Sequence, residues 1–126
     1  LKNHVKFIGT LENDDVLKKM KSSDLLLLPS VEEGIANVVL EAMAIGLLVI
    51  STNCGGMSEV VKNRYNGLLI EPRSPKGMFK AIKLISRFSE SEKSRMRVNA
   101  KKTILNKHNI KDSIRKFCEL YKKSLN

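Results

Sequence analysis

Short apolar segments bounded by turn residues recur along the first 70 residues of the chain. The clearest of them, residues 25–28, consists of four leucines between Asp24 and Pro29. Its length and its lack of polar alternation are typical of a strand that is buried on both faces of a parallel sheet. Three further segments fit strands, and they lie at residues 5–8, 47–51 and 68–70. The sequence therefore predicts a sheet of about four strands.

Apolar positions three and four residues apart predict helices between these strands. Residues 37–45 carry such a pattern, with Asn37 placed to cap the helix and Gly46 placed to end it in a left-handed conformation. A helix at residues 13–22 precedes the leucine strand, and a short one at residues 58–62 precedes the last strand. Successive strand-helix-strand crossovers of this kind produce a parallel sheet.

Helical patterns fill the rest of the chain after Pro75. Met78, Phe79, Ile82 and Ile85 recur at helical spacing, so we expect this side of the first helix to lie against the sheet. The next helix, residues 92–106, has only Met96, Ala100, Ile104 and Leu105 as apolar anchors and is predicted to be a weakly held cover. A final amphipathic helix is expected at residues 107–126.

The loop at residues 29–36 lies where a parallel sheet binds its ligand, at the carboxyl end of a strand. The helix N-terminus that follows it offers unpaired N–H groups and about half a positive charge, which favours a phosphate or diphosphate. Gly34 has no side chain and permits unusual dihedral angles. The N–H groups of Ile35, Ala36 and Asn37 could therefore approach sugar hydroxyls or phosphate oxygens.

Two glutamates accompany this loop, Glu33 just before the helix and Glu41 one turn inside it. Because helical side chains lean toward the N-terminus, both carboxylates could face the same opening. A carboxylate beside a phosphate is unfavourable unless it accepts hydrogen bonds from hydroxyl groups. We interpret Glu41 as a ligand of a ribose and Glu33 as a ligand of a hexose. The alternative is that both are solvated surface residues, which is the usual state of unpaired glutamates.

Further motifs follow these glutamates in a characteristic order. They are Glu33-Gly34, Glu41-Ala42-Met43-Ala44, Gly46-Leu47, Val49-Ile50-Ser51-Thr52, Gly55-Gly56, Glu59-Val60-Val61 and Asn66-Gly67-Leu68-Leu69. This pattern resembles the nucleotide-sugar half of the retaining glycosyltransferases of the GT-B fold, family 4, also described as glycosyl transferases group 1. The resemblance runs from about Val5 to the final helix, and the glutamates have the spacing of the E-x7-E motif of that family.

Three departures from the family pattern are visible. Ile35-Ala36 stands where an aromatic and a small residue are usual, which could alter how the sugar is held. Leu48 replaces a common proline, and Lys62-Asn63-Arg64 replaces a more acidic turn. The last two departures are expected to affect structure only.

The resemblance implies an α/β fold, with a Rossmann-like parallel sheet of about four strands flanked by helices. The chain would be a single domain, residues 1–126, and would form the C-terminal half of a GT-B fold that is truncated at its N-terminus. Residues 107–126 would form a terminal helix that packs on the missing N-terminal domain. The implied site residues are Glu33 as the catalytic residue, Gly34, Ile35, Ala36, Asn37 and Val38 at the donor sugar and phosphates, Glu41 at the ribose, and Gly9, Gly55 and Gly56 in the cleft loops.

The reaction implied by the resemblance is transfer of a hexose from a nucleoside-diphosphate sugar, such as a UDP- or GDP-hexose, to a glycan or lipid-linked acceptor. It would need no metal ion or other cofactor. In the family, the basic residues that stabilise the leaving diphosphate, and the acceptor half, would lie upstream of Leu1, so we expect the isolated chain to be inactive. The alternatives are a nucleotide-sugar epimerase of the GT-B fold and a non-enzymatic basic module that binds nucleic acid.

Length and composition agree with one globular domain, because 126 residues with 42% hydrophobic content can bury a sizeable core. No 18-residue apolar span or signal segment is evident, and a start at Leu1 suggests a piece of a longer protein. Cys54 and Cys118 are too few for a disulfide framework, so we expect reduced thiols and a cytoplasmic protein. The richness in Lys, Asn and Ile fits an AT-rich bacterial source. His4 and His108 have no partner at ligand spacing, and no metal site is expected.

Charge is distributed unevenly along the chain. The net charge is +10, and residues 62–126 hold 18 of the 23 Lys and Arg residues but only 5 of the 13 Asp and Glu residues. Such a half could attract nucleic acid or an anionic membrane. Only Tyr121 lies at the polar edge of the basic helices, so the stacking pattern of single-strand binders is missing. We therefore expect no nucleic acid. Peripheral contact with the inner face of the membrane fits the resemblance to glycosyltransferases that act on lipid-linked acceptors, with a solvated basic surface as an equal alternative.

Overall fold

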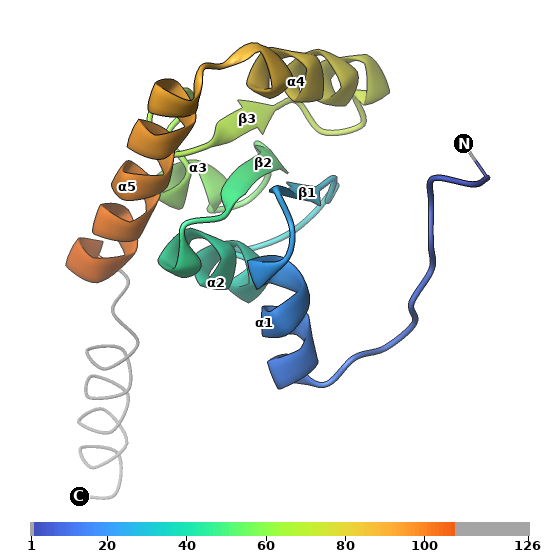
Figure 1. Cartoon of the computed structure of the whole chain (residues 1–126). Helices are drawn as coiled ribbons and strands as arrows, with labels where there is room; N and C mark the ends of the chain where they lie inside the picture. The colour runs from blue at the N-terminus through green and yellow to red at the C-terminus, as the bar shows by residue number, and fades with distance from the viewer. Residues whose placement is uncertain (1, 108–126) are drawn as a thin grey trace, which may run out of the picture.

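The computed structural model describes residues 2–107, which form a parallel sheet covered by helices on two sides (Figure 1). The sheet has three strands in the order β1-β2-β3, and each neighbouring pair is parallel. The elements in chain order are α1 Asn13–Lys21, β1 Leu25–Leu28, α2 Asn37–Ile45, β2 Leu48–Thr52, α3 Met57–Val60, β3 Leu68–Ile70, α4 Pro75–Arg87 and α5 Glu90–Lys107. The predicted α/β class and parallel sheet are confirmed.

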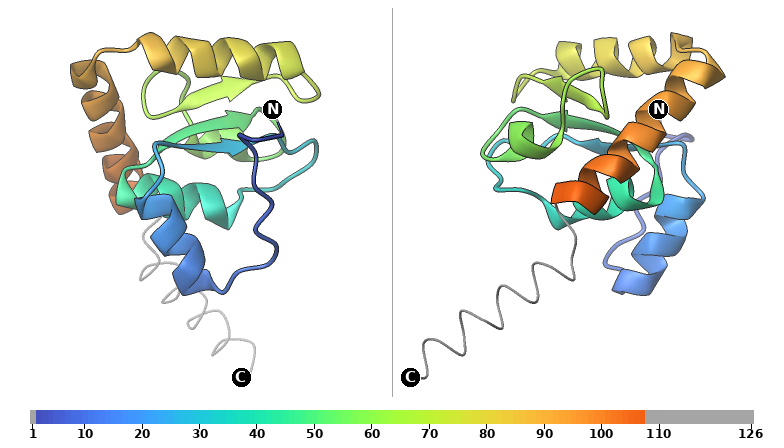
Figure 2. Two further views of the ribbon diagram at one scale, coloured as in Figure 1. Left: turned by 45° about the vertical axis from the view of Figure 1, so that its right-hand side comes forward. Right: turned by 90° about the vertical axis from the view of Figure 1, so that its left-hand side faces the viewer.

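Helices α2 and α4 lie on opposite faces of the sheet, which Figure 2 shows from two directions. Neighbouring residues of β2 alternate between these faces: Val49 packs in the cluster that contains α2, whereas Leu48 and Ile50 pack in the cluster that contains α4. All five residues of β2 are buried. This central strand therefore matches the expectation of a parallel strand covered on both sides.

The expected first strand, residues 5–8, does not form. Val5, Phe7 and Ile8 are exposed, with 95% of the Phe7 surface accessible. A strand gains its backbone hydrogen bonds only beside a partner, and this segment has no strand next to it among the described residues. The sheet accordingly has three strands in the described part of the chain and not four.

The leucine strand β1 is also less buried than its sequence predicts. It lies at an edge of the sheet, and Leu27 is 41% exposed. Helix α4 contacts β2 and β3, and its cluster reaches only Leu25 of β1. Full burial on both faces was therefore a wrong prediction for β1, because the helix layer on one side stops short of it.

Helix α2 begins and ends as a buried helix should, with one difference from expectation. Gly46 ends it in the left-handed conformation, with φ of 78°, as predicted. Asn37 is the first residue of the helix and not its cap, since Ala36 occupies the cap position and forms no side-chain capping bond. The side chain of Asn37 is exposed.

Helix α4 turns only part of the predicted side to the sheet: Met78 and Ile85 pack there as expected, whereas Phe79 and Ile82 do not. Ala81 and Ile85 are buried, while Phe79 is 64% exposed and Ile82 is 37% exposed. Ala81 and Ile85 pack in the cluster that contains Leu48, Ile50 and Leu68 of the sheet, and residues 79 and 82 lie outside it. The prediction that Phe79 and Ile82 pack on the sheet is therefore wrong.

Helix α5 crosses from the end of α4 to α2 and packs against that helix (Figure 1). Met96, Ala100 and Ile104 are buried as expected, whereas Leu105 is 69% exposed. Buried Asn66 ties the preceding turn to α5, because its amide nitrogen donates to the hydroxyl of Thr103 at 2.9 Å. The expected terminal helix, residues 107–126, lies almost wholly outside the described residues.

Candidate functional site

Three loops meet at the carboxyl edge of the sheet, where residues 29–36 follow β1, residues 53–56 follow β2 and residues 71–74 follow β3. Because the three strands are parallel, their ends face the same way, and the N-termini of α2 and α4 face this edge as well. Partial positive charge is thereby directed toward one side of the molecule. This is the region in which the sequence placed the candidate site.

The loops after β1 and β2 are in direct contact through Gly55. Its φ of +53° is left-handed, and a β-carbon at this position would lie 1.7 Å from the carbonyl oxygen of Glu33. A β-carbon at Gly56 would lie 2.9 Å from a side-chain carbon of Ile35 and 3.5 Å from Glu59 Oε1. The Gly55-Gly56 pair therefore allows the loop that carries Glu33 to rest on the turn after β2.

Hydrogen bonds hold the same loop at its beginning. The hydroxyl of Thr52, at the end of β2, donates to the carbonyl oxygen of Ser30. The buried thiol of Cys54 also approaches that carbonyl, at 3.7 Å. Ser30, Thr52 and Cys54 were not predicted as site residues, and the only sequence signal for them is their position at the ends of two neighbouring strands.

Gly34 fills a different role from the one its conformational freedom suggested. The described glycines with positive φ are Gly9, Gly46 and Gly55, so Gly34 does not use the left-handed region. A β-carbon at Gly34 would meet no atom within 4 Å. The left-handed freedom that glycine permits is therefore not used at Gly34, while open space beside its backbone is present.

Helix α2 presents a bare N-terminus to this edge. Within the described part of the chain, no side chain caps it, and the first backbone bonds to Ala36 come from Val39 and Leu40, at 3.0 and 3.3 Å. The N–H groups of Asn37 and Val38 precede these bonds. Groups of this kind can accept an anion as their partner.

The predicted residues occupy different environments around this helix end. Glu33 is exposed in the loop, and its carboxylate lies 3.4 Å from the hydroxyl of Ser30, which is long for a hydrogen bond. Ala36 is buried in the core, and Glu41 is half-buried in the second turn of α2. Glu33 and Glu41 thus belong to the loop and the helix that meet at the same N-terminus.

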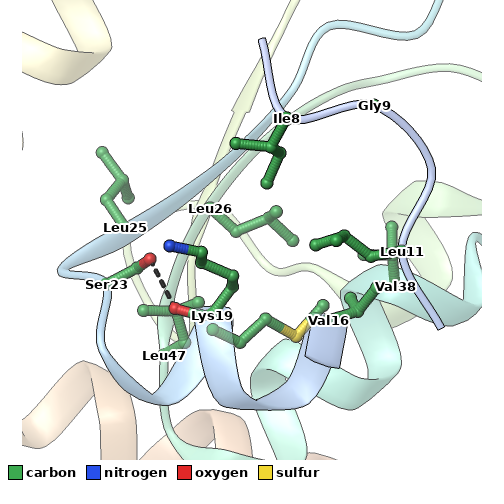
Figure 3. A pocket seen from close by; sticks show the side chains of 11 residues that line it. Ile8, Gly9, Leu11, Val16, Lys19, Ser23, Leu25, Leu26, Val38 and Leu47 are labelled. Carbon is green, nitrogen blue, oxygen red and sulfur yellow. Dashed lines mark hydrogen bonds between the residues drawn. The ribbon is translucent and has the colours of Figure 1, made fainter. Parts of the chain in front are cut away.

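Gly9 and Val38 lie at a neighbouring cavity of about 340 Å³, between the N-terminal segment, α1 and β1. Figure 3 shows the apolar side chains of Ile8, Leu11 and Leu26 around it. Gly9 thus lines this cavity, whereas the glycine turn at residues 55–56 contacts the loop of Glu33 and Ile35. The structure brings Gly55 and Gly56 to the Glu33 loop and places Gly9 at the cavity.

Two absences apply to the described residues. No three His, Cys, Asp or Glu side chains among residues 2–107 are grouped in a way that could hold a metal ion. None of the described helices combines the length and the apolar character that a membrane crossing requires.

The sequence matches the family model described as glycosyl transferases group 1 over residues 1–103. An uncharacterised glycosyltransferase of Methanocaldococcus jannaschii is 37% identical over 75 residues, which cover 60% of this chain and 19% of that protein. An α-1,3-galactosyltransferase of Escherichia coli is 32% identical over 86% of this chain and 27% of that protein. Its name gives UDP-Gal and α-D-GlcNAc-diphosphoundecaprenol as its substrates. The chain thus spans less than a third of the length of these relatives.

Solved structures agree with this match. The C-terminal domain of a glycosyl transferase group 1 family protein from Francisella tularensis superposes with a TM-score of 0.71 at 28% identity, over 82% of this chain and 53% of that one. The Anabaena protein HepE in complex with UDP-glucose gives a TM-score of 0.89 at 24% identity, over 98% of this chain and 33% of that one. The second likeness concerns the fold alone.

Proposed function

Because the chain belongs to the glycosyl transferases group 1 family, we propose that its carboxyl edge binds a nucleoside-diphosphate sugar for transfer of the hexose to an acceptor. The observation that carries this proposal is the contact between Gly55 and the carbonyl oxygen of Glu33, beside the uncapped N-terminus of α2. This contact fixes a loop with an open backbone at Gly34 next to N–H groups that suit a diphosphate.

The proposed roles follow from the chemistry of each group. The backbone from Gly34 to Val38 would donate hydrogen bonds to the phosphates and the sugar, and the half-positive helix end would stabilise charge on the leaving diphosphate. The Glu41 carboxylate would accept hydrogen bonds from the ribose hydroxyls. The Glu33 carboxylate would accept hydrogen bonds from the hexose hydroxyls and would be the catalytic residue beside the donor sugar.

The finer reaction is also a proposal: retaining transfer by a family 4 enzyme that uses no metal ion or other cofactor. A UDP- or GDP-hexose would be the donor. The name of the Escherichia coli relative includes UDP-Gal, and the structure of Anabaena HepE holds UDP-glucose. Both names support a uridine nucleotide as the first donor to test.

The acceptor and the location are proposed from the relatives. The Escherichia coli protein is named for a diphosphoundecaprenol substrate, and a 32% identical relative from Campylobacter jejuni is named for a diphospho-undecaprenol substrate. We therefore propose a lipid-linked or glycan acceptor, held by a part of the protein outside this chain, and a cytoplasmic protein in peripheral contact with an anionic membrane. On this proposal, residues 1–126 form the donor-binding domain and do not transfer sugar by themselves.

Calorimetric titration of the chain with UDP, GDP and UDP-glucose tests the donor site. Glu41→Gln should weaken UDP binding about tenfold or more, since a hydrogen bond to a charged group contributes about 1.5–3 kcal/mol. Glu33→Gln should leave UDP affinity unchanged and reduce the additional affinity for UDP-glucose. Glu32→Gln, an exposed neighbour in the same loop, is the matched control and should bind all ligands like the unmodified chain.

Two results would refute the proposal. One is equal nucleotide binding by all three variants, because the glutamates would then lie outside the site. The other is salt-sensitive binding to arbitrary oligonucleotides with no response to nucleotide sugars, which would favour the basic nucleic-acid module. Formation of free or epimerised sugar without an acceptor by the complete protein would favour the epimerase.

A further inference from the structure

Helix α4 is positively charged along its whole length. It carries Lys76, Lys80, Lys83 and Arg87, and its 13 residues include no Asp or Glu. All four basic side chains belong to exposed residues. The helix lies on the outside of the sheet, where its buried side contacts β2 and β3 (Figure 2). Its outer side is therefore a continuous basic surface.

Two large apolar side chains lie within this basic surface. Phe79 is 64% exposed and Ile82 is 37% exposed, although Ala81 and Ile85 of the same helix are buried. The spacing of three residues between Phe79 and Ile82 places them as neighbours on the outer side. The ammonium group of Lys83 lies 5.9 Å from the centre of the Phe79 ring. The outer side of α4 thus combines exposed apolar groups with cations.

The rest of the described chain leaves this face open. Helix α5 starts beside the end of α4 and runs away from it to pack on α2 (Figure 1). Of its buried anchors, Met96 packs with the buried side of α4, whereas Ala100 and Ile104 pack in the cluster of α2. Phe79 belongs to neither cluster. The energetic cost of exposing a phenylalanine and an isoleucine to water is not offset within the described residues.

The geometry points to the outer face of α4 as a docking surface for an anionic lipid bilayer. This inference rests on the proposed function, because it assigns the proposed membrane contact to one helix. Lysine and arginine attract anionic headgroups, while Phe79 and Ile82 could enter the boundary between headgroups and acyl chains. The aliphatic stems of the lysines would lie along this boundary with their ammonium groups among the phosphates.

Nucleic acid fits the same face less well. Ile82 cannot stack on a base, and Phe79 is the only aromatic residue on α4, whereas single-strand binders use aromatic side chains for successive bases. An anionic bilayer can contact both apolar side chains through its acyl chains and all four cations through its headgroups. The observations therefore favour the lipid surface over an oligonucleotide.

A single-tryptophan reporter can test this inference, because the chain contains no Trp. Phe79→Trp keeps an exposed aromatic group on α4, and Leu105→Trp places a matched reporter on exposed Leu105 of α5. Each full chain is mixed with vesicles of phosphatidylcholine alone, or with an equal amount of phosphatidylglycerol. We expect a blue shift of the emission for Phe79→Trp with anionic vesicles only, and none for Leu105→Trp.

Vesicle flotation provides the second measurement. Lys80→Gln combined with Lys83→Gln should reduce binding to the anionic vesicles about thirtyfold, since each cation near the surface contributes about 1 kcal/mol. Neutralising exposed Lys2 and Lys102 instead changes the net charge equally and should have a smaller effect. Equal losses from both pairs, a shift at residue 105 without one at residue 79, or tighter binding to an oligonucleotide than to vesicles would each overturn the inference. Nucleotide binding is measured separately, so a failed donor proposal and a failed membrane proposal give different results.

Discussion

The α-carbon of Gly55 lies so close to the carbonyl oxygen of Glu33 that a β-carbon on residue 55 would come within 1.7 Å of that oxygen. The residues are 22 positions apart, and they join the loops that follow two neighbouring strands. The position of the Glu33 loop therefore depends on a missing side chain in the other loop.

Gly55→Ala should both destabilise the protein and weaken nucleotide-sugar binding. The left-handed conformation alone costs about 1–2 kcal/mol for a residue with a β-carbon, and the clash would push the Glu33 loop away. Thermal unfolding and calorimetric titration with UDP-glucose measure the two effects. Gly34→Ala is the matched control, because its β-carbon has open space and its φ is not positive.

The control variant separates folding from binding. Gly34→Ala should unfold like the original chain but bind UDP-glucose about tenfold more weakly, if a ligand group approaches the backbone at Gly34. Unchanged stability of Gly55→Ala would show that the two loops do not rest on each other in solution.

Asn66→Ala should be strongly destabilising because the side chain is buried and both its oxygen and its nitrogen form hydrogen bonds. Its oxygen accepts from the N–H group of Lys62 at 2.7 Å, and its nitrogen donates to the carbonyl of Val60 and the hydroxyl of Thr103. Removing it leaves buried polar groups without partners, at a cost of about 2–3 kcal/mol. Denaturant unfolding would measure this cost, with Asn53→Ala at an exposed position as the control. Equal unfolding midpoints would contradict the role of Asn66 as a tie between the turn and α5.

Much of the fold was predictable from local patterns. Leu68 to Ile70 and the helix end at Gly46 appear where the sequence places them, because turn dipeptides and left-handed glycines act within a few residues. Local patterns fail where the formation or burial of a strand depends on residues that are distant in the sequence. Residues 5–8 are apolar enough for a strand but have no neighbour to pair with, and β1 has a helix over only part of one face.

In the candidate site, too, the features set by neighbouring residues were predictable and the contacts between distant residues were not. Glu33, Gly34 and the start of the following helix are adjacent in the sequence, so their common location could be predicted together. The contact from Gly55 to Glu33 and the bond from Thr52 to Ser30 join residues of different loops, and no periodicity encodes such contacts. The prediction that Phe79 packs on the sheet was wrong for a related reason. Helical spacing alone does not show on which side of α4 Phe79 lies, and this becomes clear only from the burial of Ala81.

Helix α5 begins with a capping box whose strength should depend on pH. The Glu92 carboxylate accepts from the N–H and hydroxyl groups of Ser89, both at 2.8 Å, and these bonds lower the pKa of Glu92. Because the pKa is lower in the folded state, the stabilisation is present above the ordinary pKa of glutamate. It is lost as the pH falls through the folded value.

Ser89→Ala should weaken this pH dependence, because it removes the hydroxyl donor but keeps the backbone N–H group of residue 89. The pKa of Glu92, measured by NMR titration, should move only part of the way back toward that of an ordinary glutamate, and stability at neutral pH should fall by about 1 kcal/mol because the helix loses its N-cap hydroxyl. Glu90 serves as an internal reference, because Lys93 lowers its pKa through a different contact that Ser89→Ala leaves in place. A pKa of Glu92 that does not respond to the substitution would show that the hydroxyl group of Ser89 does not bond to this carboxylate.

Thr52→Val tests whether the bond to Ser30 positions the loop. Valine keeps the shape of the buried side chain but removes the hydroxyl group that donates to the Ser30 carbonyl. We expect stability to fall by about 1 kcal/mol and hydrogen exchange in residues 30–36 to become faster. Thr52→Ser retains the hydroxyl group and should protect the loop like the original residue. Because the same loop carries Glu33, the valine variant should also bind UDP-glucose more weakly than the serine variant does. If both variants bind and exchange alike, the hydroxyl of Thr52 does not hold the loop, and the contacts made by Gly55 and by the Cys54 thiol hold it instead.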